Sequence, residues 1–285
     1  MAQTKKEIQS LLSEAQAAPR QRLGQNFMID GNLVRLVAEA PQIASGDLVL
    51  EIGPGTGTLT EELLKTGADL LAVEIDRNLA SLLRQRFAAV SNFRLIEGDA
   101  LAGKHSLNAQ LLQAIAQAKS ANRTIRLAAN LPYNIASPLA VELLLAGVDV
   151  LAFTVQREVA DRLRATSGKE YGPLSIMTQL LAKVEVLRKM PPQAFWPMPK
   201  VDSALVRLTR QDQLGKRAEE FSTFIHRLFS SRRKMLRKAL TQAEVDADRV
   251  LAATGVPPTI RPEELSPQRC WDLFVACDAS CELRG

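Results

Sequence analysis

Cysteine and histidine are scarce in this sequence of 285 residues, which contains three cysteines and two histidines. Cys270, Cys277 and Cys281, together with His105 and His226, are too dispersed to supply the clustered ligands of a zinc site. An odd number of cysteines is also typical of reduced thiols in a cytoplasm rather than of a disulfide framework. We therefore predict a cytoplasmic protein without a metal centre.

Long apolar runs are missing as well. No run approaches the ~18 residues that a membrane-spanning helix needs. The segment 1–19 lacks the apolar core of a secretory signal, and it contains Glu7 and Glu14 but no arginine, which disfavours an organelle transit peptide. The sequence thus predicts no membrane contact. It also has no heptad repeat or long apolar face that would indicate anything beyond a monomer.

The stretch 47–65 carries the clearest pattern in the chain. Its apolar run 48–52 is bounded by turn residues, which predicts a strand buried on both faces. Gly53, Gly55 and Gly57 then predict a tight turn, and a leucine-rich helix follows. Such a corner lets a ligand approach the backbone N–H groups, because no Cβ blocks the way. It favours a nucleotide-like ligand over a purely structural turn.

Acidic residues follow the next two predicted strands. Glu74 ends the apolar run 69–75, about 20 residues after Gly53, where an acid can bind both hydroxyls of a ribose. The alternative is a solvated acid at a strand end. Asp99 follows the strand predicted at 93–96 and points into the same crevice. It either accepts a hydrogen bond from an exocyclic amino group, which makes adenine the base, or caps the following helix.

The segment Asn130-Leu-Pro-Tyr-Asn134 follows the strand predicted at 125–129. An asparagine side chain offers both an acceptor and a donor, Pro132 fixes the backbone, and Tyr133 supplies a flat face for stacking. Together they can hold a planar base that carries an amino group and is flipped out of its stack. The same segment is also an acceptable turn.

Two further segments allow two interpretations each. The proline-rich segment 190–200 contains two aromatic residues, one of them Phe195, which either pack in the core or stack on a base. The polar segment 20–28 contains Arg20 and Arg22. It is either a plain loop or a lid over the ligand whose arginines reach phosphate.

Basic residues are concentrated in one region. Residues 200–240 contain eleven Lys and Arg against four Asp and Glu, although the whole chain has a net charge of only +5. A basic stripe of this kind favours contact with a nucleic-acid backbone, the alternative being a solvated helix face. The densest part, 231–238, supplies five candidates for RNA contact: Arg232, Arg233, Lys234, Arg237 and Lys238.

Eight short motifs are distributed along the chain: Leu23-Gly-Gln-Asn-Phe27, Glu51-Ile-Gly-Pro-Gly-Thr-Gly57, Glu74-Ile-Asp76, Gly98-Asp99-Ala100, Asn130-Leu-Pro-Tyr-Asn134, Pro197-Met-Pro-Lys-Val-Asp-Ser203, Ser231-Arg-Arg-Lys234 and Arg261-Pro-Glu-Glu-Leu265. Through these motifs, residues 20–274 resemble the ribosomal RNA adenine dimethyltransferase family, and most of all its bacterial small-subunit branch. A glycine turn after the first strand occurs in many methyltransferases. The motif Asn-Leu-Pro-Tyr together with Pro-x-Pro-x-Val-Asp-Ser is much more specific to this family. The chain departs from the family pattern in an N-terminal extension and in Met28, where leucine is usual.

The resemblance implies an α/β fold with a small all-α C-terminal domain. The α/β part would be a Rossmann-like class I methyltransferase sheet of seven strands, the last one antiparallel, with helices on both faces. Residues 1–19 would form an N-terminal extension, residues 20–209 the S-adenosylmethionine-dependent methyltransferase domain, and residues 210–285 a helical RNA- or ribosome-binding domain.

The resemblance also assigns roles to individual residues. Glu74 would bind the ribose of S-adenosylmethionine and Asp99 its adenine amino group. By motif matching, six residues would contact this cofactor: Asn26, Met28, Gly53, Glu74, Asp99 and Asn130. The target adenine would lie between Tyr133 and Phe195, and Asn130 Oδ1 and the carbonyl of Leu131, beside Pro132, would accept its two amino hydrogens. The residues expected at the RNA are those of the basic cluster with Arg20 and Arg22.

The activity implied is dimethylation of N6 on two adjacent adenines in the 3′-terminal hairpin loop of 16S rRNA, within an immature small ribosomal subunit. A resistance-type methyltransferase of 23S rRNA would share the fold and the cofactor. A third possibility is an assembly checkpoint factor that binds immature subunits without catalysis. A nicotinamide dehydrogenase is disfavoured, because the glycine corner lacks the G-x-G-x-x-G spacing.

Overall fold

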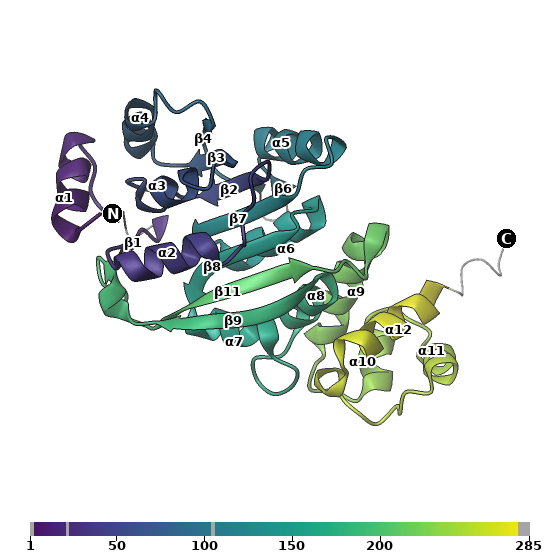
Figure 1. Ribbon diagram of the computed structural model, residues 1–285. Helices are drawn as coiled ribbons and strands as arrows, with labels where there is room; N and C mark the ends of the chain where they lie inside the picture. The colour runs from purple at the N-terminus through teal and green to yellow at the C-terminus, as the bar shows by residue number, and fades with distance from the viewer. Residues whose placement is uncertain (1–2, 21–22, 104–105, 279–285) are drawn as a thin grey trace. The chain divides into compact units, whose positions relative to one another are not determined.

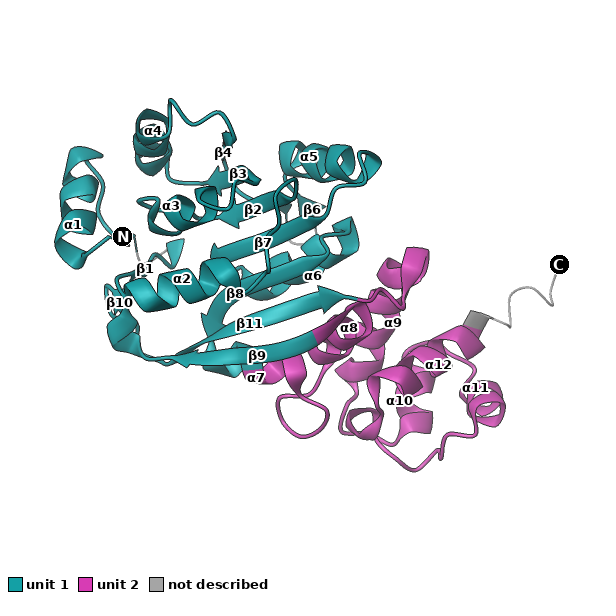
Figure 2. Cartoon of the chain, in the orientation of Figure 1, with its two compact units in different colours: residues 1–160, 184–210 teal, residues 161–183, 211–285 magenta. Residues whose placement is uncertain are grey.

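The computed structural model describes residues 3–20, 23–103 and 106–278 (Figure 1). The chain divides into two compact units (Figure 2). Unit 1 contains residues 1–160 and 184–210, and unit 2 contains residues 161–183 and 211–285. Residues 161–183 thus cluster with the C-terminal part, whereas the sequence interpretation assigned them to the α/β domain. Among the described residues, no helix combines the length and the apolar character needed to span a bilayer.

Unit 1 is built on a sheet of seven strands in the order β4-β3-β2-β7-β8-β11-β9. The bounds of these strands are β2 (Leu48–Ile52), β3 (Asp69–Glu74), β4 (Phe93–Glu97), β7 (Ile125–Asn130), β8 (Val150–Gln156), β9 (Ala182–Met190) and β11 (Ser203–Arg210). Strands β4, β3, β2, β7 and β8 pair in parallel, and β11 pairs antiparallel to β8. This topology confirms the predicted Rossmann-like methyltransferase sheet. The strand order reverses between β2 and β7, which is where open α/β sheets bind ligands.

The central strands are buried on both faces. Side chains alternate between the faces of a strand, and Val49 and Ala128 join a core cluster with helices α2 (Gly31–Glu39) and α3 (Thr58–Leu64). The neighbouring side chain on β2, Leu50, points to the opposite face and is equally buried. Burial on both faces explains why these strands read as continuous apolar runs in the sequence.

The remaining elements of unit 1 surround this sheet. Helices α4 (Arg77–Arg86), α5 (Ala109–Ser120) and α6 (Ala136–Ala146) connect its strands, and α7 (Arg157–Arg164), which begins at the end of β8, is divided between the two units. Two small ribbons pair β1 (Phe27–Met28) with β10 (Phe195–Trp196) and β5 (Leu101–Gly103) with β6 (Ser106–Leu107), and a short 3₁₀ turn, η2, spans Pro192–Ala194. The N-terminal extension also folds: helix α1 (Lys5–Glu14) packs against α4.

Unit 2 is helical. It contains α8 (Pro173–Leu181), α9 (Ala218–Ser230), α10 (Leu236–Gln242), α11 (Ala247–Thr254) and α12 (Pro267–Asp278), with 3₁₀ turns η3 (Gly215–Arg217) and η4 (Pro262–Glu264). Phe221 on α9 packs against Trp271 and Phe274 on α12, with ring centroids 5.2 and 5.4 Å apart. Helix α8 packs on α9 and α12, and the buried Tyr171 donates a 2.6 Å hydrogen bond to the carbonyl of Leu265. These contacts explain why residues 161–183 belong to this unit.

Candidate functional site

A narrow cavity of about 70 Å³ lies at the carboxyl ends of β2, β3 and β7, at the point where the strand order reverses. Its lining comes from four parts of the chain: residues 23–28, residues 51–59 around the glycine turn, Glu74 with Ile75, and Asn130 with Pro132. The cavity therefore gathers four of the eight motifs that stand far apart in the sequence.

The glycine turn needs glycine for two physical reasons. Gly53, Gly55 and Gly57 have φ values of 72°, 62° and 86°, a left-handed region that other residues rarely adopt. In addition, a Cβ placed on Gly55 would lie only 2.9 Å from the ring of Phe27. Phe27 is itself part of the cavity lining, so the turn and the segment 23–28 are in close contact at this wall.

Glu74 is the acid at the centre of this wall, and its side chain is 2% exposed. Its Oε2 accepts a 3.1 Å hydrogen bond from the backbone N–H of Gly55, and its Oε1 accepts a 2.9 Å bond from that of Asp76. Burial raises the pKa of Glu74 to about 7, despite these two bonds. The carboxylate therefore links the turn to the end of β3, and it changes protonation near neutral pH.

Glu51 lies beneath the turn and has a different role. It is 1% exposed, and it accepts a 2.7 Å hydrogen bond from the hydroxyl of Thr60. Burial raises its pKa to about 8, so the carboxyl is mostly neutral at pH 7. Its bond to Thr60 links the end of β2 to helix α3, and Glu51 also lines the narrow cavity.

Asn130 is held by two hydrogen bonds that fix the orientation of its amide. Its Nδ2 donates to the backbone carbonyl of Asn26 at 2.6 Å, and its Oδ1 accepts from the hydroxyl of Thr154 at 2.5 Å. A carbonyl can only accept, so the NH₂ group must face Asn26. The Oδ1 atom keeps a second lone pair after bonding Thr154. The sequence interpretation missed Thr154, because a hydroxyl inside an apolar strand gives no signal of its own.

A wide cavity of about 780 Å³ adjoins the narrow one. The two share Gly24, Gln25 and Asn26, and the wide cavity is otherwise lined by Pro19, Tyr133, Asn134, Gln156 and residues 197–201. Tyr133 is half-buried, and its hydroxyl lies 2.6 Å from Ser203 Oγ. Burial raises the pKa of Tyr133, so the hydroxyl stays neutral and the ring is held at the wall. The segment 130–134 thus runs from the narrow cavity to the wide one.

Most of the residues expected at the cofactor lie together. Five line the narrow cavity: Asn26, Met28, Gly53, Glu74 and Asn130. Asp99 is not part of this lining. It is exposed, and its Oδ1 accepts a 3.0 Å bond from the N–H of Leu101, which forms a turn into β5 instead of the expected helix cap. The helix that follows is capped by Asn108.

Phe195 differs from its expected role as a stacking partner. It is 2% exposed, pairs with Met28 across the β1–β10 ribbon, and belongs to the core cluster that contains Val34. It lines neither of the two cavities. Packing, rather than stacking, is therefore the role that the geometry gives this ring. Two other residues were expected beside the target adenine: Leu131 is buried, and Pro132 lines the narrow cavity.

The candidates for RNA contact differ in their pairing and in their exposure. In unit 1, Arg20 forms an ion pair with Asp76 at 3.3 Å, and Arg22 lies outside the described residues. In unit 2, Arg232 is held by Glu263 at 2.9 Å and by two backbone carbonyls. Arg237 pairs with Asp248 at 2.7 Å. Arg237 is exposed although it is paired, and Arg233, Lys234 and Lys238 are exposed as well.

The cysteines are not placed for chemistry. Burial raises the pKa of Cys270 to about 12 and that of Cys277 to about 11, so both thiols stay protonated at neutral pH. Cys281 lies outside the described residues. In residues 3–20, 23–103 and 106–278, no three His, Cys, Asp or Glu side chains are grouped as a metal site would require.

Known proteins resemble this chain over most of its length. The family described as ribosomal RNA adenine dimethylase matches residues 17–276. A protein of Pseudomonas fluorescens named ribosomal RNA small subunit methyltransferase A is 40% identical over 262 residues, which are 90% of this chain and 92% of the relative. A protein of the same name from Synechocystis is 40% identical over 276 residues, covering 90% of this chain and 95% of its own.

Two solved structures share the fold. The 23S rRNA methyltransferase ErmE has a TM-score of 0.65 and 25% identity, with 89% of this chain and 100% of that chain covered. A dimethyladenosine transferase from Plasmodium falciparum has a TM-score of 0.70 and 23% identity, with coverage of 90% and 98%.

Proposed function

The chain belongs to the ribosomal RNA adenine dimethylase family, and from this premise we propose that it is an rRNA adenine methyltransferase of the small-subunit type. Its proposed reaction is dimethylation of N6 on two adjacent adenines in the 3′-terminal hairpin loop of 16S rRNA. The relatives named for the small subunit are about 40% identical over some nine-tenths of the chain, whereas the 23S enzyme is 25% identical. This difference favours the small subunit as the target.

One observation supports the proposed methyl transfer to a base. Segment 130–134 passes from the narrow cavity, lined by Asn130, to the wide cavity, lined by Tyr133. A methyl donor and a flipped-out base must meet at such a junction, because the transferred methyl group has to lie within bonding reach of the acceptor nitrogen.

S-adenosylmethionine is the proposed cofactor, and the residues that line the narrow cavity suit its functional groups. The glycine turn brings the backbone of Gly53 and Gly55 to the cavity lining without side chains, and the buried Glu74 can accept hydrogen bonds from both hydroxyls of a ribose. Asn26, Met28 and Asn130 would complete the contacts. When bound, the cofactor supplies an electrophilic methyl sulfonium, which requires no metal. Asp99 lies outside the lining of this cavity, but it is exposed and its carboxylate accepts one bond from Leu101, so it stays the proposed acceptor for the adenine amino group.

The proposed catalysis is mostly positioning. The free lone pair of Asn130 Oδ1 and the carbonyl of Leu131 would accept the two amino hydrogens of adenine. Those bonds draw N6 toward tetrahedral geometry and free its lone pair from the ring. Tyr133 would stack on the base, an interaction worth about 1–3 kcal/mol. No strong general base is needed, because the amino proton becomes acidic once nitrogen is methylated and can leave to water.

The proposed partner is 16S rRNA within an immature small subunit. Arg233, Lys234 and Lys238 are the basic residues of the cluster best suited to phosphate contacts, since their side chains are exposed. Arg232 and Arg237 are less suited, because each already forms an ion pair.

Methyl transfer from labelled S-adenosylmethionine to small subunits that lack the modification tests the proposal, with nucleoside analysis of the product. We expect N6,N6-dimethyladenosine at two adjacent positions near the 3′ end of 16S rRNA. Label in large-subunit RNA alone would instead support a 23S enzyme. Tight binding to immature subunits without any transfer would support the assembly checkpoint.

A further inference from the structure

Residues 3–16, here called the N-terminal arm, fold onto unit 1 as a structured element. Thr4 caps helix α1: its hydroxyl accepts a hydrogen bond from the N–H of Glu7, and the Glu7 carboxylate accepts one from the N–H of Thr4. Such a reciprocal capping box fixes where the helix begins. Ile8 and Leu12 are fully or almost fully buried, so the helix is anchored by its apolar face.

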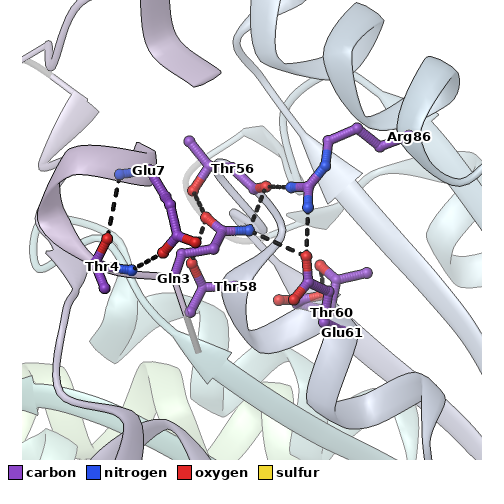
Figure 3. A network of polar contacts seen from close by, with 9 residues as sticks. Gln3, Thr4, Glu7, Thr56, Thr58, Thr60, Glu61 and Arg86 are labelled. Carbon is purple, nitrogen blue, oxygen red and sulfur yellow. Dashed lines mark hydrogen bonds and ion pairs between the residues drawn. The ribbon is translucent and has the colours of Figure 1, made fainter. Parts of the chain in front are cut away.

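Gln3 stands just before this cap and reaches the glycine turn (Figure 3). Its Oε1 accepts 2.7 Å hydrogen bonds from the hydroxyls of Thr56 and Thr58. Its Nε2 donates to the carbonyl of Thr56 at 3.2 Å and to Glu61 Oε1 at 3.3 Å. A primary amide has two donor hydrogens and two acceptor lone pairs, and all four are used here. The side chain is 5% exposed, so these bonds are shielded from water.

The network continues on the far side of the turn. Arg86 donates one hydrogen bond to the carbonyl of Thr56 and another to Glu61, the same two groups that Gln3 contacts (Figure 3). Thr56 and Thr58 both line the narrow cavity and are themselves buried. Without Gln3, these buried hydroxyls would lose their acceptor, and an unsatisfied buried polar group is costly.

The arm reaches the narrow cavity by a second route. Ile8 and Leu12 share an apolar cluster with Phe27, whose ring lies against Gly55 and lines the cavity. Lys5 lies 5.9 Å over the ring of Trp196, which stacks on Phe27 at 6.4 Å. The arm thus supports the wall from the side of the turn and from the side of segment 23–28.

On the basis of the cofactor site assigned under the proposed function, we propose that Gln3 is a positioning residue for the methyl donor: it holds the glycine turn in the shape that binds S-adenosylmethionine. The N-terminal arm then contributes to the binding of the cofactor. Gln3 acts through Thr56 and Thr58, so its loss should weaken cofactor binding while the affinity for RNA stays the same.

Point variants of the full-length chain test this inference. Gln3→Ala removes all four hydrogen bonds, and Gln3→Glu keeps the acceptors but loses both donors and brings a carboxylate against Glu61. Gln9→Ala is the matched control, because Gln9 is an exposed residue of the same arm. We expect Gln3→Ala and Gln3→Glu each to raise the Kd for S-adenosylhomocysteine about tenfold by calorimetry. Gln9→Ala should leave it unchanged.

Three further readouts separate positioning from general destabilisation. For Gln3→Ala, the KM for S-adenosylmethionine should rise while the KM for small subunits changes less than about twofold. Amide exchange in residues 53–59 of the free protein should become faster, while the Tm shifts by only a few degrees. If both Gln3 variants bind S-adenosylhomocysteine as the unsubstituted chain does, or if the Tm falls and the Kd does not change, the inference is wrong. If the unsubstituted chain itself fails to bind S-adenosylhomocysteine, the proposed function fails instead.

Discussion

The narrow and the wide cavity of unit 1 share residues 24–26, yet their walls are built in opposite ways. The narrow cavity is bordered by a hydrogen-bonded turn and by the almost fully buried Glu74 and Thr56. The wide cavity is bordered by residues 197–201, in which Met198 is 63% exposed and Val201 is 45% exposed. A small ligand that is identical in every reaction suits a preformed frame, because little ordering is needed when it binds. An RNA loop is better bound by a wall of exposed side chains that can change their conformation.

Asn130 lies where the two cavities meet, so its substitution should have the largest effect. Asn130→Ala removes the acceptor Oδ1 and the donor to Asn26, and we expect kcat to fall about 10³-fold, since a preorganised hydrogen-bonding group at the reacting atoms is lost. Binding of S-adenosylhomocysteine should weaken only several-fold. Single-turnover methylation and calorimetry measure the two quantities. Full turnover with normal cofactor binding would contradict the role given to Asn130.

The protonation of Glu74 should make ligand binding in the narrow cavity depend on pH. Its pKa is raised to about 7, so the carboxylate that binds ribose hydroxyls is present above this pH and is lost as the pH falls through it. We expect the Kd for S-adenosylhomocysteine to rise about tenfold for each pH unit below 7. In Glu74→Gln, binding should be weak but independent of pH. A flat profile for the unsubstituted chain between pH 5.5 and 8 would refute this prediction.

A substitution of Thr154 tests whether Asn130, in the wall of the narrow cavity, has to be held in one orientation. Thr154→Val keeps the volume but removes the hydroxyl that orients Asn130, and we expect kcat to fall about tenfold. Thr178→Val is the matched control, because Thr178 is also fully buried and its hydroxyl has no hydrogen-bond partner among the residues that the structure describes. That variant should keep its activity and be at least as stable. Equal activity of the two variants would mean that Asn130 does not depend on Thr154.

Substitutions of Tyr133 test how far the wide cavity tolerates changes in its wall. The Tyr133→Phe variant should give the smallest effect of this series. Tyr133→Phe keeps the stacking face and loses only the bond to Ser203, so we expect the KM for small subunits to rise about two- to threefold. Tyr133→Ala should raise it by tenfold or more, because stacking is also lost. A loss in Tyr133→Phe as large as that in Tyr133→Ala would show that the hydroxyl, rather than the ring, binds the base.

The sheet and the glycine turn could be predicted because their signals are local. An apolar run, three glycines and the acid that ends the next apolar run are visible in a short window, and Gly53, Gly55 and Glu74 of these segments line the narrow cavity. For Phe195 the sequence left packing and stacking open, since the choice depends on pairing with Met28, far away in the sequence. For Asp99 the sequence left a contact with an amino group and a helix cap open, and the structure shows a bond to the N–H of Leu101 in place of the cap.

The remaining differences also come from long-range contacts. Gln3 contacts residues more than 50 positions away, and nothing in its own surroundings marks it. Residues 161–183 join unit 2 through packing on α9 and α12. Within the basic cluster, Arg232 pairs with Glu263 and Arg237 pairs with Asp248. Spacing along the chain gives no information on any of these pairings.

Gly24, Gln25 and Asn26 line both cavities, and this has a consequence for the energetics of the two ligands. A ligand in one cavity that orders these three residues removes part of the ordering that the other ligand would otherwise require. Thermodynamic linkage makes such an effect reciprocal, so the donor and the RNA would change each other's affinity by the same factor.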